Sequence, residues 1–202
     1  MLVRAHFGAT TSSTLLAIGG ALTVLDAGKV TKFTDATFSY TPITVGSSGF
    51  LGDTATNDFI SWGLWTKATQ TTLNTTSSNT TISNLHFVAG QPTGVMPITG
   101  SASYSLAGYT APTLYTGVSG VLNSATFSVS FDTSKVNASM VTSFGTVSGS
   151  YMSLSGQDFT DGTNSIRGFF VGANAARAGL TYSGYSSTNG GMFSGAAVFL
   201  KQ

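Results

Sequence analysis

Cysteine and glutamate are both absent from this chain of 202 residues, and proline occurs only four times. The absence of cysteine excludes disulfides, thiolate metal sites and cysteine nucleophiles. The absence of glutamate leaves seven aspartates as the only acidic side chains. Because helix surfaces are usually built from Glu, Lys, Ala and Arg, this composition argues against a helical fold.

Charge of either sign is scarce. Charged residues make up 7% of the chain, the formal net charge is +1, and the eight lysines and arginines are scattered singly. Binding to a phosphate backbone needs a basic cluster, so we expect no nucleic-acid partner. No apolar run approaches the roughly 20 residues of a membrane-spanning helix.

Small polar residues and aromatics dominate what is present. Serine and threonine together occupy 60 positions, glycine occupies 25, and aromatic residues make up 11% of the chain. Threonine, valine and aromatic side chains favour strands, and glycine favours the turns between them. The composition therefore predicts an all-β protein.

Apolar and polar residues alternate with a period of two in about nine or ten runs, each closed by Gly, Pro, Asn or Asp. In "SASYSLAG", for example, Ala102, Tyr104 and Leu106 share one side of the expected strand. Short connections favour pairing of neighbours in sequence order, and closure into a barrel removes exposed edges. We expect an eight-stranded antiparallel up-and-down β-barrel with a filled apolar interior.

Alternation alone does not say which side of a strand faces inward. In "ATFSVSFD", Phe127, Val129 and Phe131 lie on one face and Ser128 and Ser130 on the other. A water-soluble barrel buries the first set, whereas an integral outer-membrane barrel turns it to lipid. The short runs and the presence of only two tryptophans favour the first orientation.

Residues 1–57 are expected to form N-terminal strands that lead into the barrel, and residues 58–202 the barrel itself, within one compact domain. The polar segment 69–84, "TQTTLNTTSSNTTISN", is expected to be a long loop. We expect the export signal to lie outside this chain.

The segment "GFFVGANAARAGLTY", from Gly168 to Tyr182, places two aromatics between glycines, then a turn that we expect to start at Asn174 and end at Gly179. Together with the final "GGMFSGAAVF", it resembles the closing hairpin of the transferrin-binding protein B-like β-barrel family. "SWGLWT" and "LHFVAGQPTGVMPITGSASYSLAG" resemble earlier strands of a subgroup attached to FecR-like signalling domains in bacteria. The resemblance covers about two thirds of the chain, from Ser61 to Lys201.

This resemblance implies an eight-stranded barrel exported to the periplasm or the bacterial cell surface. Relatives in the family include surface lipoproteins that bind host transferrin, haemoglobin or a complement regulator, and a secreted haem scavenger. They are binding proteins rather than enzymes. Their ligand surfaces lie on variable loops or on a separate handle domain, so no binding residue carries over to a position of this chain.

Three residues are candidates for ligand binding. Tyr109 and Tyr115 lie in "AGYTAPTLYTG", expected to be a loop, and tyrosines on loops commonly anchor protein partners. His86 in "NLHFV" is expected to be a hydrogen-bonded strand histidine, although it could also ligate haem iron. A single histidine without a nearby acidic cluster is a poor zinc site, and no Gly-x-Ser-x-Gly motif is present.

The first functional hypothesis is therefore a non-enzymatic cell-surface or periplasmic binding module for a protein ligand, such as an iron or haem carrier. Two alternatives stay open. One is a structural extracellular barrel without a small ligand, and the other is an integral eight-stranded outer-membrane barrel.

Overall fold

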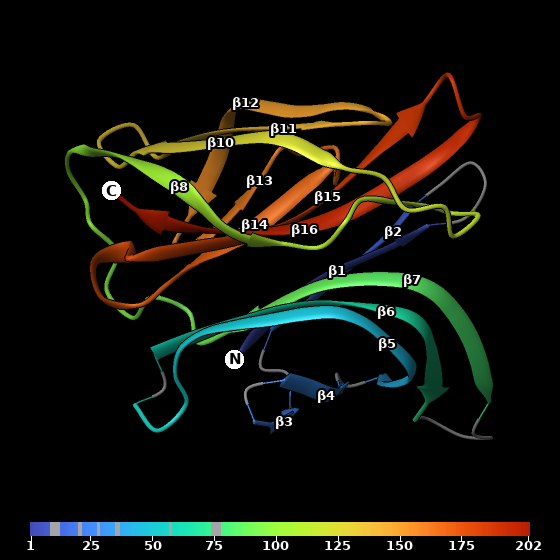
Figure 1. The fold of residues 1–202 in the computed structure, drawn as a ribbon. Coiled ribbons are helices and arrows are strands. Elements are labelled where there is room, and N and C mark those ends of the chain that lie inside the picture. Colours follow the sequence, from blue (N-terminus) through green and yellow to red (C-terminus); the bar gives the residue numbers. More distant parts are fainter. Residues whose placement is uncertain (9–12, 20–21, 28, 35–36, 57, 74–77) are drawn as a thin grey trace.

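The structure, a computed structural model, describes residues 1–8, 13–19, 22–27, 29–34, 37–56, 58–73 and 78–202. Two β layers lie against each other, a closed barrel and a separate curved sheet (Figure 1). Within those residues the helical structure is limited to one short 3-10 turn, Ala173–Ala175. The predicted all-β class is confirmed.

The barrel contains eight antiparallel strands, each paired with the next, and its last strand pairs with its first. A two-residue strand, β9 (Thr113–Leu114), lies beside the last one. The predicted eight-stranded up-and-down barrel is thus confirmed. Its strands are β8 (Ser101–Tyr109), β10 (Leu122–Ser130), β11 (Lys135–Thr142), β12 (Gly145–Ser155), β13 (Asp158–Thr160), β14 (Ile166–Val171), β15 (Arg177–Ser186) and β16 (Gly191–Lys201).

Apolar side chains fill the barrel. Phe127, Val129 and Phe131 are no more than 5% exposed and belong to one buried cluster, while Ser128 and Ser130 line a cavity on the outer wall. The alternative orientation, with the three apolar side chains turned to lipid, is wrong. The filled interior was predicted correctly.

The consecutive aromatics Phe169 and Phe170 point to opposite faces of β14, as successive strand residues must. Phe170 lies in the barrel core, whereas Phe169 lies on the outer wall in a cluster shared with the sheet. Gly168 faces the core, where a Cβ would lie 2.3 Å from the ring of Phe159. The following turn is shorter than expected, because β15 already begins at Arg177.

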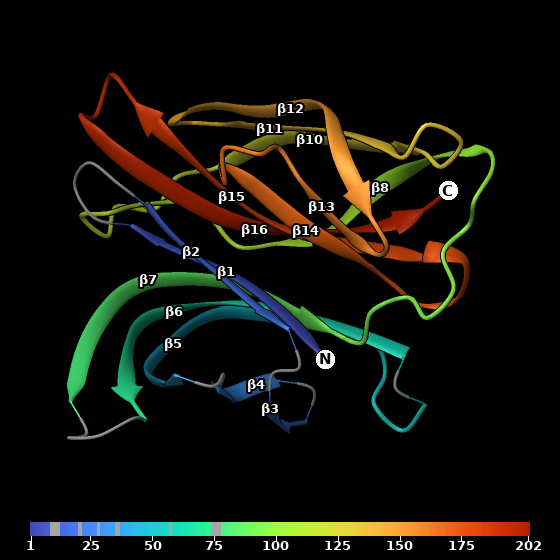
Figure 2. The same ribbon diagram turned by 180° about the vertical axis from the view of Figure 1, so that it is seen from behind.

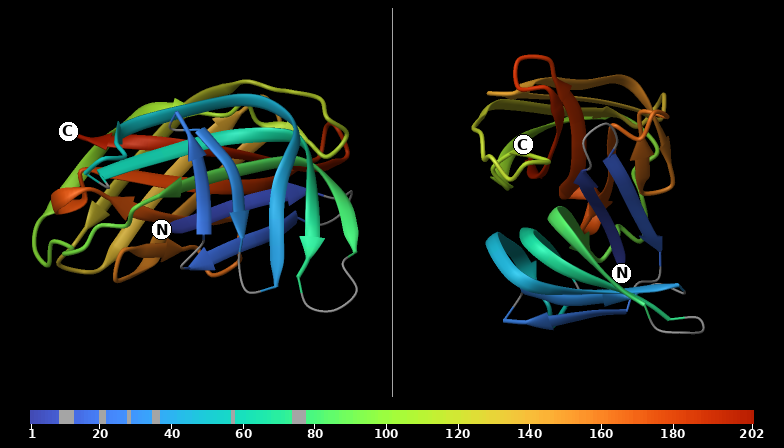
Figure 3. Two further views of the ribbon diagram at one scale, coloured as in Figure 1. Left: turned by 90° about the horizontal axis from the view of Figure 1, so that it is seen from below. Right: turned by 90° about the vertical axis from the view of Figure 1, so that its right-hand side faces the viewer.

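The sheet contains seven antiparallel strands in the order β2-β1-β7-β6-β5-β4-β3. The sheet is strongly curled (Figure 3). It encloses its own core, in which the Phe33 ring stacks on Tyr40 at 4.9 Å and on Trp65 at 5.0 Å between ring centroids. The strands are β1 (Leu2–Gly8), β2 (Ser13–Gly19), β3 (Leu22–Asp26), β4 (Lys29–Thr34), β5 (Phe38–Asp53), β6 (Asp58–Thr72) and β7 (Asn79–Gly90).

Residues 58–90 belong to this sheet, and the strands of the barrel begin at Ser101. The expectation of a loop over residues 69–84 is wrong, because β6 continues to Thr72 and β7 begins at Asn79. Threonine has a high β propensity, which fits strands there, although the polarity of the segment suggested a loop. Residues 74–77 lie outside the described part of the chain.

The long strand β5 is only partly paired on its outer side. Within the described residues, β4 pairs with it at Ser39 and Tyr40 alone. Beyond Tyr40, β5 contains Pro42 and three shifts of register against β6 before Ser48. These irregularities accompany the curl of the sheet.

The barrel core depends on Phe170. Its ring lies 5.4–6.1 Å, between centroids, from the rings of Tyr104, Phe127, Phe131 and Phe159. We expect Phe170→Ala to lower the free energy of unfolding by about 3–5 kcal/mol, through lost burial and the cavity left behind. Urea unfolding followed by circular dichroism measures this change.

Val95→Ala is the control, because Val95 is 84% exposed, and we expect it to change stability by less than about 0.5 kcal/mol. Equal effects of the two substitutions would contradict the assignment of Phe170 as a central core residue.

Candidate functional site

The sheet lies against the outer wall formed by β14, β15 and β16, and β1 and β7 are its nearest strands (Figure 2). This contact zone is called the seam below. Its apolar part is one buried cluster with four members from each layer: Leu2, Ile60, Trp62 and Val88 from the sheet, and Phe169, Val171, Ala196 and Val198 from the barrel. If the outer wall of the barrel were in contact with water on all sides, its four positions in this cluster would be expected to carry polar side chains.

Trp62 packs between the two layers at one side of the seam. Its indole ring lies between Gly49 of β5 and Gly108 of β8, where a Cβ would come within 2.1 and 2.0 Å of the ring carbon Cζ2. Both positions therefore require glycine, because no flexible atom could move aside. Trp62 and Trp65 face opposite sides of β6, with Trp65 in the core of the sheet.

A cavity of about 360 Å³ adjoins this ring. Tyr109, at the end of β8, is 44% exposed and lines the cavity with Ser48 and Trp62. The segment expected as one loop is therefore partly strand, since Tyr109 ends β8 and β9 follows at Thr113. An exposed tyrosine beside a tryptophan and a concave surface is suited to contact with another molecule.

Tyr115 occupies a different part of the seam. Its ring covers Gly191, where a Cβ would lie 2.3 Å from it, and its backbone N–H donates to the Met192 carbonyl at 3.0 Å. The side-chain amide of Asn84 donates to the Tyr115 carbonyl at 3.4 Å. Tyr115 is half-buried and does not line the Tyr109 cavity.

His86 faces the seam from β7 and is fully buried. Its Nδ1 lies 2.7 Å from the Thr110 hydroxyl, whereas Nε2 has no partner within the described residues. Burial lowers the pKa of His86 to about 3, with a smaller contribution from His6 in the same direction. The ring has no exposed surface to offer haem iron.

His6, on β1, is the register partner of His86 and is also fully buried. Its Nε2 donates to the Asn164 carbonyl at 2.9 Å, so its Nδ1 is the acceptor for the Thr181 hydroxyl at 2.8 Å. Burial lowers the pKa of His6 to about 4, although the Asn164 carbonyl and Asp161 act in the opposite direction. Sequence reasoning missed this residue, because no motif surrounds it.

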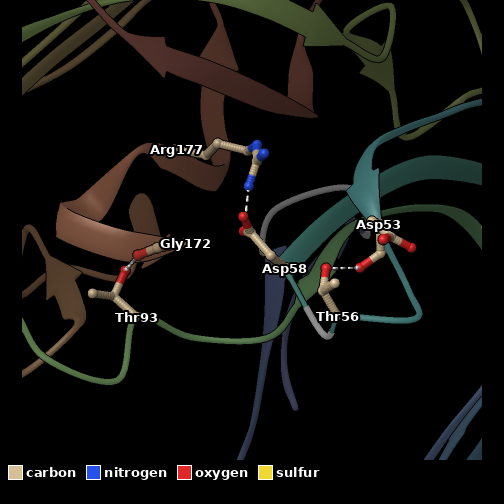
Figure 4. Close-up of polar contacts among 6 residues, drawn as sticks. All are labelled: Asp53, Thr56, Asp58, Thr93, Gly172 and Arg177. Carbon is tan, nitrogen blue, oxygen red and sulfur yellow. Dashed lines mark hydrogen bonds and ion pairs between the residues drawn. The ribbon is translucent and has the colours of Figure 1, made fainter.

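Two ion pairs cross the seam. Arg177 of β15 donates to Asp58 of β6, and Arg4 of β1 donates to Asp158 of β13. Figure 4 shows Arg177 reaching Asp58, with the Thr93 hydroxyl donating to the Gly172 carbonyl at 2.9 Å nearby. The Asp58 side chain is 44% exposed, so this pair contributes little to stability.

Within the described residues, no three His, Asp or other ligating side chains group as a metal site. The same part of the chain has no helix with the length and apolarity needed to cross a membrane.

No protein-family model matches the sequence, and no curated protein matches it. The chain is similar in structure to lobes of transferrin binding protein B. A double mutant of that protein from Haemophilus parasuis matches with a TM-score of 0.49 and 16% identity, over 100% of this chain and 45% of that one. The protein from serogroup B Neisseria meningitidis matches with a TM-score of 0.49 and 14% identity, over 100% and 44%.

The N-lobe domain of lactoferrin binding protein B from Moraxella bovis matches with a TM-score of 0.42 and 13% identity, over 100% of this chain and 98% of that one. The chain thus spans under half the length of the two transferrin binding protein B structures and nearly all of this lobe. These proteins are of the family that the closing hairpin resembles, and at such identities the likeness concerns the fold alone.

The buried histidines predict that acid weakens the fold. Their pKa values in the folded state, about 4 and about 3, lie below the ordinary 6.5. Between pH 6.5 and 4 the unfolded chain therefore binds protons that the folded chain does not. The contribution of the two histidines to the free energy of unfolding is thus fully present above pH 6.5 and is lost as the pH drops. We expect a loss of about 4 kcal/mol between pH 7.5 and pH 5 for the two residues together.

Urea unfolding across this pH range tests the expectation, with the double variant His6→Asn, His86→Asn as the comparison. Both replacements are polar and neither titrates, so the slope of stability against pH should flatten even if the variant is less stable overall. An unchanged slope would show that other groups control the acid response.

Proposed function

We propose that this chain is a non-enzymatic protein-binding module of an exported bacterial protein, acting at the cell surface or in the periplasm. The sequence resemblance of the closing hairpin to the transferrin-binding protein B-like family supports this class of function. The observation that carries the proposal is Tyr109, a large side chain 44% exposed at the end of a paired strand beside a cavity of about 360 Å³.

The filled barrel supports binding on the outside of the molecule. Its interior holds the aromatic cluster around Phe170, so a ligand has to use the outer wall, the connections or the seam. Tyrosine is among the residues that most often dominate binding energy, because it offers a large apolar ring and a hydroxyl at low entropic cost. Tyr109 is fixed by its pairing with Ala197 and by the adjacent Gly108 contact with Trp62.

Host iron-carrier proteins are the proposed ligands, on the basis of the family resemblance. Haem itself is not part of the proposal, because the His86 ring is fully buried. Tyr115 is proposed to have a supporting role, since its ring covers Gly191 and its carbonyl accepts from Asn84.

Biolayer interferometry of the intact chain against serum transferrin and lactoferrin tests the proposal. We expect one of them to bind, and Tyr109→Ala to weaken that binding by at least about tenfold, as expected for loss of a central aromatic contact.

Tyr151→Ala is the matched control. Tyr151 is 75% exposed on β12, in the half of the barrel wall that the sheet does not cover, and we expect its removal to leave binding unchanged. Binding that both tyrosine variants retain would contradict a recognition site at Tyr109, and no binding to either carrier would overturn the proposed ligand class.

A further inference from the structure

The chain contains three arginines, and all three lie at or beside the seam. Arg4 and Arg177 each have an aspartate partner, Asp158 and Asp58. Arg167 of β14 forms no ion pair or hydrogen bond through its guanidinium within the described residues, and its buried Nε has no partner. A guanidinium that is partly removed from water without a partner costs free energy, which an incoming acceptor would recover.

Arg167 lies in a row of polar side chains on the outer wall of the barrel. Thr160 of β13 is its register partner, and Ser153 of β12 is in turn the partner of Thr160. The three side chains line a cavity of about 300 Å³, together with Ser155 and Asp158. The hydroxyl groups of Ser153, Ser155 and Thr160 therefore lie around the same cavity as the guanidinium.

The charged side chains that line the cavity, Arg167 and Asp158, together with Arg4, the ion-pair partner of Asp158, leave one positive charge without a partner. Arg4 and Arg167 contribute two positive charges, and Asp158 contributes one negative charge that already binds Arg4. The pKa of Arg4 is lowered mainly by burial and also by the charge of Arg167, although Asp158 raises it. One positive charge is thus left for a ligand, and the Asp158 carboxylate opposes any ligand with two negative charges.

We propose that this cavity binds a single carboxylate group, with Arg167 as the principal contact and Ser153, Ser155 and Thr160 as hydroxyl donors. The planar fork of a guanidinium matches the two oxygens of a carboxylate. The unit positive charge fits a monoanion better than a phosphate dianion. The carboxylate belongs either to a small organic acid or to an acidic side chain of a protein.

Side-chain NMR can test the site directly, because a chain with three arginines gives only three Nε–H resonances. We expect acetate to shift the Arg167 resonance along a saturable curve, with half-saturation in the millimolar range or below. The Arg4 and Arg177 resonances should move little. Sodium chloride at equal ionic strength should not reproduce the curve, and phosphate at pH 8 should bind at least about threefold more weakly than acetate.

A blocked peptide containing one glutamate distinguishes the two sources of the group. Binding at least about tenfold tighter than that of acetate assigns the site to an acidic protein segment, whereas equal or weaker binding assigns it to a small acid. A linear response, or equal shifts of all three arginines in acetate and chloride, would overturn the proposal.

Two variants complete the test, read from the backbone amide of Thr160. Arg167→Lys keeps the charge but removes the planar fork, and we expect it to weaken acetate binding by at least about fivefold. Lys135→Gln is the control, since Lys135 is a cation of β11 paired with Ser153 that does not line the cavity. It should leave binding unchanged.

The Tyr109→Ala variant separates this site from the proposed recognition surface. It should bind acetate as the unsubstituted chain does, whatever its effect on iron-carrier binding. Unaltered acetate binding by Arg167→Lys in a folded protein would show that the guanidinium is not the binding group.

Discussion

The close approach of the curved sheet to the barrel wall is the constraint on which the rest of the structure depends. Trp62 from the sheet enters a space that exists only because Gly49 and Gly108 have no side chains. Ile60 uses the same device at Gly179, where a Cβ would lie 2.4 Å from its Cδ1. Large residues of the sheet thus meet the barrel glycines Gly108 and Gly179, with Gly49 of the sheet itself also against the Trp62 ring, and a modest apolar cluster achieves tight packing.

This packing removes polar groups from water at the same time. His6, His86, Thr110 and Thr181 are all buried at the seam, and most of their hydrogen bonds connect one layer to the other. Both imidazoles have pKa values far below their usual range, because burial disfavours their charged forms. The seam therefore combines a buried apolar cluster with buried polar groups, and protonation of either histidine there is unfavourable.

Period-two alternation was sufficient to predict the barrel. Phe127, Val129 and Phe131 alternate with serines in one run, and a closed sheet follows once neighbouring runs pair in order. The same rule failed to predict the second layer, because strands of a half-buried sheet and of a barrel show the same period. Nothing local in β6 or β7 reveals that Ile60 and Val88 pack on a distant wall.

The candidate site was predictable only in part. The expected loop "AGYTAPTLYTG" pointed to both Tyr109 and Tyr115, of which Tyr109 is exposed and Tyr115 is half-buried over Gly191. Arg167 has no motif around it, since its importance comes from cross-strand neighbours on β12 and β13 and from the fact that the nearby Asp158 carboxylate already binds Arg4. Such information depends on register and is set by tertiary pairing.

The outer side of β5 has a consequence for how the molecule behaves at high concentration. A bare strand edge normally templates the addition of another chain, and in the part of the chain that the structure describes β5 offers such an edge beyond Tyr40. An arriving strand would meet Pro42, which lacks an N–H, and then a backbone whose spacing changes three times before Ser48. It could form no continuous ladder, so this margin resists self-association into fibres while the strand stays long enough to hold Gly49 under the indole.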